Sequence, residues 1–461
     1  MNIKDILEKH KKDFSKLVTT LCVDKTERDV EKYRKEYEGE HDILDRPVKT
    51  VGKGINVRRV EQAKLVIRHQ RKIVNMAVSF LFGDPAKLIL ANKEDKYQEI
   101  FSLVNDVWNK NKLEYFNKKL ARRLFVETKV AELWYVIVDD QNIKHIKVAL
   151  LCDKNGDDIY AHFNENGDMD AFTRRYKLED RDGKKYDHVD IYTAENFIKG
   201  TKKGEAWEVK NEVNLFGKIP VIFYEQAEPE WTSVQTEIDR IEMLISKSAD
   251  TNDYFGSPTL KIKGKITNPP EKAEVGKILQ FTGEAGAEGK IEYGDAEYLT
   301  WTHAPEAVKL EYETLKDIIY SLTSTPDLSF NNVQGLTKTS GEALKFLFMD
   351  AILKAKDHEE IFGEALTRRV NLLKAILSVT DVKSKQTLEE MDISIEFGDI
   401  LPQSITETIK ALSTARGGDA IMSRDSAVRR NPLVEDSEED IKRLEEEEKS
   451  EVANLGESFN V

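Results

Sequence analysis

Residue types that could do chemistry are abundant in this chain, but their spacing fits no catalytic or metal-binding pattern. Gly-Lys pairs, as at Gly52 and Gly217, are never followed by Ser or Thr, so the phosphate-binding loop of an ATPase is missing. The eight histidines and two cysteines are scattered and not grouped at metal-ligand spacing. No Gly-x-Ser-x-Gly string marks a nucleophile. We therefore expect no enzyme activity, no cofactor and no metal site.

The carboxylates leave one alternative open. The chain has 84 Asp and Glu residues, so acidic pairs occur throughout and a catalytic pair cannot be chosen from spacing. Two segments, Asp153–Asp157 and Asn164–Asp170, resemble calcium loops but lack the full ligand series, and we interpret them as hairpin turns. An unrecognised carboxylate enzyme therefore stays an alternative.

The composition restricts the class of protein. Two cysteines, Cys22 and Cys152, argue against a disulfide scaffold, and neither a secretory signal nor a membrane span is expected. The net charge is −14, with 84 acidic and 70 basic residues among 461, although residues 1–130 hold 29 basic and 20 acidic residues. This balance argues against a protein that grips nucleic acid over most of its surface. It is compatible with a protein that lets nucleic acid pass.

Hydrophobic periodicity predicts a helical first part and then a β region. Helices are predicted over 57–82, ending at Gly83-Asp84-Pro85, and over 97–124. The basic cluster between Arg58 and Lys72 is interpreted as the solvated face of the first helix. Strands are predicted over 133–138, 145–152, 189–192 and 219–224, with hairpin turns at Asn155-Gly156, Asn166-Gly167 and Asp182-Gly183.

The second half predicts two helices separated by a small β insertion. The helices span 232–252 and 305–322, and Pro305 suits the first turn of the second. A polar loop, Thr323–Ser340, then leads to a capping box, Thr339–Glu342, and a long helix to about Ser378 in which we expect a kink. The remaining predicted elements are insertion strands at 259–262, 277–281 and 290–293, a strand at 391–397, and a charged helical end from Pro402.

The helix over 305–322 has two distinct edges. One edge alternates spacings of four and three residues and forms a narrow apolar seam of Val308, Tyr312, Leu315, Ile319 and Leu322. The other edge, expected to meet water or a charged partner, consists of Lys309, Glu313, Lys316 and Tyr320. The seam packs either against a neighbouring subunit or inside the core of its own subunit, and both readings stay open.

Several strings, taken in order, resemble the portal proteins of tailed bacteriophages of the siphophage-like type. They are Ile219-Pro220-Val221 before the 232–252 helix, Tyr320–Asp327 before the polar loop, Thr339–Lys345, Ile393–Phe397, and Ile421-Met422-Ser423 before a Glu-rich end. The resemblance implies an α+β, mainly helical subunit that forms a ring, usually of twelve. It places residues 1–230 and 342–400 in the wing, 231–255 and 305–323 in two stem helices, 256–304 in the clip, 324–341 in a tunnel loop, and 401–461 in a helical crown with an acidic tail.

The function that the resemblance implies is a channel for double-stranded DNA at one capsid vertex, used in packaging and ejection. The implied partners are the terminase large subunit, a head-tail adaptor, and the major capsid and scaffolding proteins, without a membrane. The implied location is the virion, and the host cytoplasm during assembly. The alternative is a cytoplasmic helical scaffold that binds only other proteins.

The resemblance also implies roles for particular residues. The seam would pack stem helices between subunits, and the edge with Lys309 and Lys316 would face the channel. The tunnel loop would present polar side chains that touch phosphate weakly and let DNA slide, namely Asn331, Asn332, Gln334 and Lys338.

Overall fold

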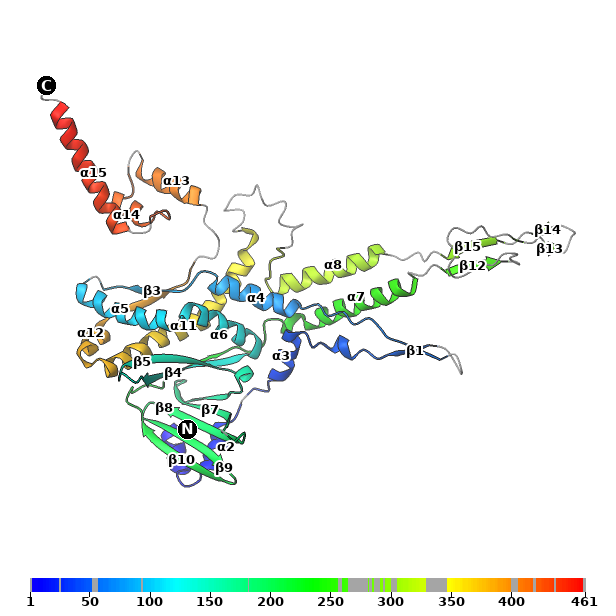
Figure 1. Ribbon diagram of the computed structural model, residues 1–461, viewed down its shortest axis with the longest axis horizontal. Coiled ribbons are helices and arrows are strands. Elements are labelled where there is room, and N and C mark those ends of the chain that lie inside the picture. Colours follow the sequence, from blue (N-terminus) through cyan, green and yellow to red (C-terminus); the bar gives the residue numbers. More distant parts are fainter. Residues whose placement is uncertain are drawn as a thin grey trace.

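The computed structural model describes residues 2–458, except for 25, 52–56, 93, 181, 256–258, 264–280, 282–283, 286–290, 293–294, 300–304, 329–345, 399–404, 418–419 and 435–436. It has a mixed α+β fold. Figure 1 shows a helical body with a β-sheet below it, a helical hairpin projecting to one side, and a separate group of helices at the C-terminal end.

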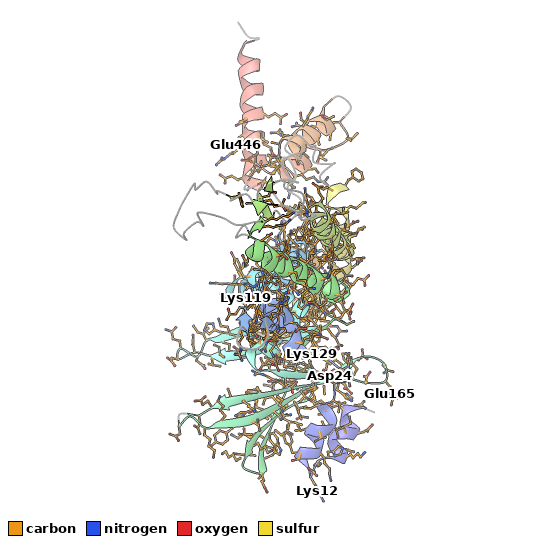
Figure 2. The ribbon with its side chains drawn as sticks, turned by 90° about the vertical axis from the view of Figure 1, so that its right-hand side faces the viewer. Lys12, Asp24, Lys119, Lys129, Glu165 and Glu446 are labelled. Atoms are coloured by element: carbon orange, nitrogen blue, oxygen red, sulfur yellow. The ribbon has the colours of Figure 1, made fainter. Side chains whose placement is uncertain are left out.

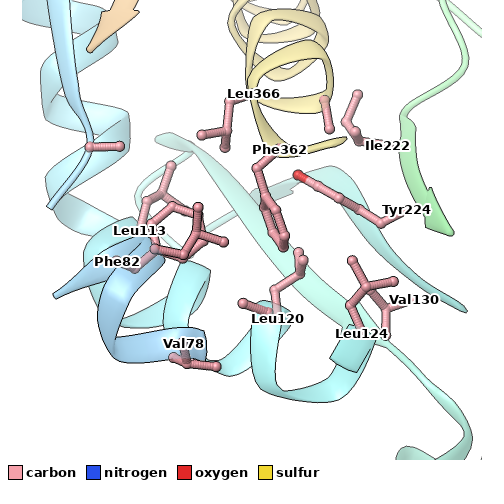
Figure 3. Close-up of a cluster of buried hydrophobic side chains, with 14 of the residues drawn as sticks. Val78, Phe82, Leu113, Leu120, Leu124, Val130, Ile222, Tyr224, Phe362 and Leu366 are labelled. Carbon is pink, nitrogen blue, oxygen red and sulfur yellow. The ribbon is translucent and has the colours of Figure 1, made fainter. Parts of the chain in front are cut away.

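The core of the body is made by helices that are far apart in the sequence. They are α4 (His69–Phe82), α5 (Asp95–Lys110), α6 (Leu113–Glu127) and the long α11 (Met349–Thr380). They pack on an antiparallel sheet of order β11-β4-β5, with β4 at Lys129–Val138, β5 at Lys144–Leu151 and β11 at Val221–Glu225. In Figure 3, Phe362 of α11 points between Leu120 of α6 and Tyr224 of β11, and all three side chains are buried.

A short strand pair closes the body. Strand β3 (Lys87–Leu90) pairs antiparallel with β16 (Ile393–Glu396), so Leu90 lies opposite Ile393. Helix α12 (Lys385–Glu390) precedes β16 and packs on α5 and α11. The strand predicted over 391–397 is confirmed.

A second antiparallel sheet lies beside the body and is covered by the N-terminus. Its order is β10-β9-β8-β7-β6, from β6 (Asp158–Phe163), β7 (Met169–Glu179), β8 (Lys185–Thr193), β9 (Asn196–Lys203) and β10 (Ala206–Val213). Helices α1 (Ile3–Lys9) and α2 (Phe14–Leu21) pack their apolar side chains on this sheet. Figure 2 shows Lys129 and Asp24 close together near the junction with the body, and their ion pair is 2.6 Å long.

The projecting hairpin, which we call the stem, consists of α7 (Gln235–Phe255) and α8 (Pro305–Leu322). Beyond its free end lie the strand pairs β12 (Thr259–Lys263) with β15 (Asp295–Leu299), and β13 (Glu284–Ala285) with β14 (Ile291–Glu292). The predicted order of helix, β insertion and helix is therefore confirmed. The strand predicted at 277–281 lies almost wholly outside the described residues.

The C-terminal helices are α13 (Ile405–Arg416), α14 (Arg424–Arg429) and α15 (Ser437–Ser458). Helix α14 contacts both of its neighbours, and Arg424 pairs with Glu448 of α15 at 2.5 Å. In Figure 2, Glu446 of α15 and Lys12 of the α1–α2 turn lie at opposite ends of the molecule.

The prediction of one helix over 57–82 is wrong in its first half. Residues 58–60 form β2 (Arg58–Val60), which pairs with β1 (Lys49–Val51), and residues 61–67 are extended. We call 61–67 the strap, because it lies along α7. The backbone N–H groups of Ala63, Leu65 and Ile67 donate to side chains of α7: Asp250 at 2.6 Å, Ser246 at 3.0 Å and Glu242 at 2.7 Å.

The strap is extended because the spacing of alternate residues in an extended chain matches the rise between every fourth residue of helix α7. Alternate residues of an extended chain are about 6.7 Å apart, and every fourth residue of a helix rises about 6 Å. Every second N–H of the strap therefore meets an acceptor at every fourth position of α7. These bonds satisfy backbone donors that a helix would otherwise have satisfied internally.

Two further predictions are corrected by local geometry. The segment predicted as one helix over 97–124 forms α5 and α6, because Lys112 has a positive φ of 51° that ends α5. At this break the Asn111 side-chain amide donates to the carbonyl of Ile146 in β5 at 3.0 Å. The turn at Asn155-Gly156 joins β5 of one sheet to β6 of the other and makes no hairpin. The turns at Gly167 and Gly183 do join paired strands, and both glycines have positive φ.

Candidate functional site: the stem and its base

The apolar seam of α8 packs mainly within its own chain. Ile319 is fully buried in the main core, Tyr312 and Leu315 pack partly buried against that core, and Val308 is half-buried. Leu322 differs, since 61% of it is exposed. The two stem helices are also joined by Arg240 of α7 and Glu311 of α8, at 2.6 and 2.8 Å. A contact of this seam with a neighbouring subunit stays a prediction.

A different edge of α8 is exposed and apolar. Leu310 is 66% exposed, Ile318 37% and Leu322 61%. Together with Thr314 they recur at every fourth residue and form one continuous stripe. We call these four residues the α8 stripe. The sequence reasoning missed it because the seam had the better heptad spacing.

The charged edge of α8 divides into two parts. Lys309 and Glu313 are exposed and form an ion pair at 3.8 Å, with 72% of the Lys309 side chain accessible. Such an exposed pair contributes little to stability. These two side chains are free to meet a charged partner.

Lys316 and Tyr320, in contrast, are engaged at the base of the stem. Lys316 donates to Asp327 at 2.9 Å, and this hydrogen bond raises the lysine's pKa. Lys72 of α4 reaches the same carboxylate at 3.5 Å, donates to the Tyr320 hydroxyl at 2.8 Å and lies 4.2 Å from that ring's centroid. The sequence offered Lys72 only as part of a basic run, so this cluster was not predicted.

The chain that leaves α8 is fixed by a tight helix end. Ser324 has a positive φ of 51°, and the Thr325 N–H donates to the Tyr320 carbonyl at 2.8 Å, as in a Schellman motif. Thr323 and Thr325 are buried, and Lys354 of α11 donates to the Thr323 carbonyl at 2.9 Å. Residues 323–328 are therefore held on the body.

The predicted tunnel-loop residues lie outside the described residues, as does the capping box at Thr339–Glu342. They are Asn331, Asn332, Gln334 and Lys338. On the far side of this gap residues 346–347 are helical, and Phe348 separates them from α11.

A buried carboxylate supports the start of α11. Glu230 lies 2.6 Å from Lys354 and 3.4 Å from His358. Burial alone would favour the neutral acid, but the contacts with His358 and Lys354 outweigh it and lower the pKa of Glu230 to about 2. The same lysine therefore links this carboxylate to the end of α8.

The described part of the chain offers no metal centre and no membrane helix. No group of three or more His, Cys, Asp and Glu side chains in those residues is arranged to hold a metal ion. None of the helices described is both long enough and apolar enough to span a bilayer.

Sequence comparison places the chain in a class of structural proteins, the phage portal proteins. Residues 22–453 match the family described as "Phage portal protein, SPP1 Gp6-like". Because the match covers most of the chain, the protein belongs to this family. The family is structural and not enzymatic. No curated protein matches the sequence.

Three solved structures are similar to the chain at low identity. One is "Virion of native gene transfer agent (GTA) particle", with a TM-score of 0.42 and 10% identity over 87% of this chain and 92% of that chain. The second, "Neck of native GTA particle computed with C12 symmetry", has a TM-score of 0.41 and 11% identity over 79% and 89%. The third, "Neck of empty GTA particle computed with C6 symmetry", has a TM-score of 0.40 and 10% identity over 77% of this chain and 87% of that chain.

Proposed function

We propose that this portal protein forms a ring, of twelve subunits, around a channel at one capsid vertex through which double-stranded DNA is packaged and ejected. The observation that carries the proposal is the family match over residues 22–453. The projecting stem supports it, because α7 and α8 together form an elongated element that can line a channel.

The charge distribution is consistent with passage of DNA. Residues 131–400 carry a net charge of −17, and residues 401–461 carry −6. Phosphate is bound by cationic contacts, so a channel poor in cations holds DNA weakly. Of the two predicted channel lysines that the structure describes, Lys309 is more exposed than Lys316, and it shares its edge with Glu313.

The remaining parts of the proposal concern partners. The residues between α7 and α8 would form the clip that docks the terminase large subunit and later the head-tail adaptor. The wing would contact the major capsid and scaffolding proteins. The protein would be located in the virion, and in the host cytoplasm during assembly.

Negative-stain microscopy of the purified chain tests the ring. We expect particles with a central hole at micromolar concentration. A chain that stays monomeric at high concentration would contradict the proposal.

A DNA packaging assay tests the channel face. Lys309→Glu should lower packaging severalfold, while Lys177→Glu, at an exposed lysine of β7, serves as the control. Lys316→Glu is a poor test, because it also breaks the bond to Asp327. Replacing Asn331, Asn332, Gln334 and Lys338 together by alanine tests the tunnel loop. Unchanged packaging in both variants would remove these residues from the channel.

A further inference from the structure

In the part of the chain that the structure describes, two apolar faces are exposed, one on the stem and one beside it. The first is the α8 stripe defined above. The second combines the strap with the arm, which is our name for the strands β1 and β2 and the adjoining Val57. Val57 is 48% exposed, Val60 47% and Leu65 41%. A two-stranded pair with exposed valines is only marginally stable in water. The arm therefore needs a surface to cover it.

These faces lie on opposite sides of α7. Figure 1 shows α8 on one side of α7, and β1 on the other, projecting in the same direction as the stem. The bonds of the strap to Glu242, Ser246 and Asp250 fix it to its side of α7. The two apolar faces, the α8 stripe and the face of the arm and strap, therefore point away from each other on either side of α7, and neither can cover the other.

Charge complementarity suggests which surface covers the arm. The sequence from 46 to 64, which holds the arm and most of the strap, has six basic residues and one acidic residue. The two stem helices, 235–255 and 305–322, have nine acidic and four basic residues. A basic arm meeting the acidic stem of another copy lowers the electrostatic energy of both.

We propose that the arm and strap of one subunit dock on the α8 stripe of the next subunit. Two different faces on one molecule make a heterologous contact, which closes into a ring when the rotation between copies permits it. Apolar side chains fill the centre of the contact, and Lys49, Arg59 and Lys64 surround it. This inference rests on the ring proposed above and identifies the surface that closes it.

Cross-linking between two differently labelled chains tests the contact. Each chain carries one introduced cysteine in a Cys22→Ser background, and the remaining native cysteine, Cys152, is buried. A chain with Val60→Cys, assembled with a chain carrying either Leu310→Cys or Ile318→Cys, should give a cross-linked dimer with a short bismaleimide. The control uses Val213→Cys in place of Val60→Cys. Val213 is an exposed valine of β10, so this pair of chains gives the background yield of cross-linking. We expect at least a tenfold higher yield with Val60.

A second variant measures the energetic role of the arm. Val57→Asp combined with Val60→Asp should raise the concentration at which rings half-assemble by at least tenfold, whereas Val213→Asp should leave it unchanged. Intact rings from the double variant, together with background cross-linking, would overturn the docking proposal and leave the ring standing. If the unmodified chain forms no ring, the proposed function fails as well.

Discussion

The buried Arg369–Glu132 pair offers the most decisive test of how the body is held together. Arg369 of α11 and Glu132 of β4 are both fully buried. The arginine Nε lies 3.0 and 2.9 Å from the two carboxylate oxygens, and one terminal nitrogen donates to Asn117 at 2.8 Å. The Tyr224 hydroxyl donates to the same carboxylate at 2.9 Å. This network joins α11 to α6, β4 and β11.

Arg369→Met keeps an unbranched apolar stem but removes the guanidinium, so that among the described residues the Tyr224 hydroxyl remains as the donor to the buried Glu132 carboxylate. Removing one partner of a buried pair costs about 3–5 kcal/mol, because a charge is left without compensation. The free energy of unfolding, measured by urea titration with tryptophan fluorescence, should fall by this amount. The matched control is Arg368→Met, one residue earlier, whose side chain is 50% exposed and pairs with Glu364. That exposed pair should contribute less than about 1 kcal/mol.

A double variant separates the charge from the packing. Adding Glu132→Gln to Arg369→Met removes the uncompensated charge and keeps an acceptor for Tyr224. It should therefore recover about 1–3 kcal/mol relative to Arg369→Met alone. The reasoning is refuted if Arg369→Met costs no more than Arg368→Met, or if Glu132→Gln destabilises the Arg369→Met chain further.

Three smaller perturbations follow from the same structure. Burial would raise the pKa of Glu230, but His358 and Lys354 lower it to about 2, so the stabilisation from Glu230 is present above about pH 4.5 and is lost as the pH falls towards 2. Glu230→Gln should therefore flatten the fall of the melting temperature between about pH 4.5 and 2. His41 lies 2.5 Å from Glu242, the same carboxylate that accepts from Ile67 of the strap. Burial opposes the charged form of His41, but its hydrogen bonds to Glu242 and to the Glu36 carbonyl raise its pKa, so its contribution is present below about pH 6.5 and lost at higher pH. Protection of the strap amides against hydrogen exchange, corrected for the intrinsic rates, should therefore be lower at pH 9 than at pH 6. Gly363→Ala within α11 should raise the free energy of unfolding by about 0.5–1 kcal/mol, because alanine favours the helix and the nearest atom to the new methyl group lies at 3.8 Å, an ordinary contact. A lower free energy of unfolding in urea titration would contradict this.

Elements set by local signals were predicted well. Helix α8 runs from Pro305 to Leu322 as the first-turn proline and apolar spacing indicated, and β4 contains the predicted strand at 133–138. The strap could not be predicted, because the acceptors that hold it extended lie about 180 residues later in the sequence. Its apolar residues fit a helical pattern locally, and bonds to α7 overrode that pattern.

The sequence indicated which residues of α8 form its apolar and charged edges, but only partly which residues they contact. Lys309 and Glu313 are exposed, whereas Lys316 and Tyr320 are engaged by Lys72 and Asp327, and a channel role of this edge stays a prediction. Helical spacing grouped four of the five seam residues on a buried or half-buried edge of α8, whereas Leu322 is exposed. It could not tell whether their partner is α7 of the same chain or a helix of another.

The pairing of β3 with β16 sets when the subunit can finish folding. Strand β16 and the core helix α11 come after the entire stem in the sequence. Residues 87–90 of β3 can therefore pair only after residues 393–396 of β16 have been synthesised. A growing chain therefore completes its arm and stem before the last core helix is available. Contacts this distant in sequence slow folding. The surfaces that we propose join subunits are thus synthesised before the body that orients them, and we expect the proposed ring to close only after translation has passed residue 396.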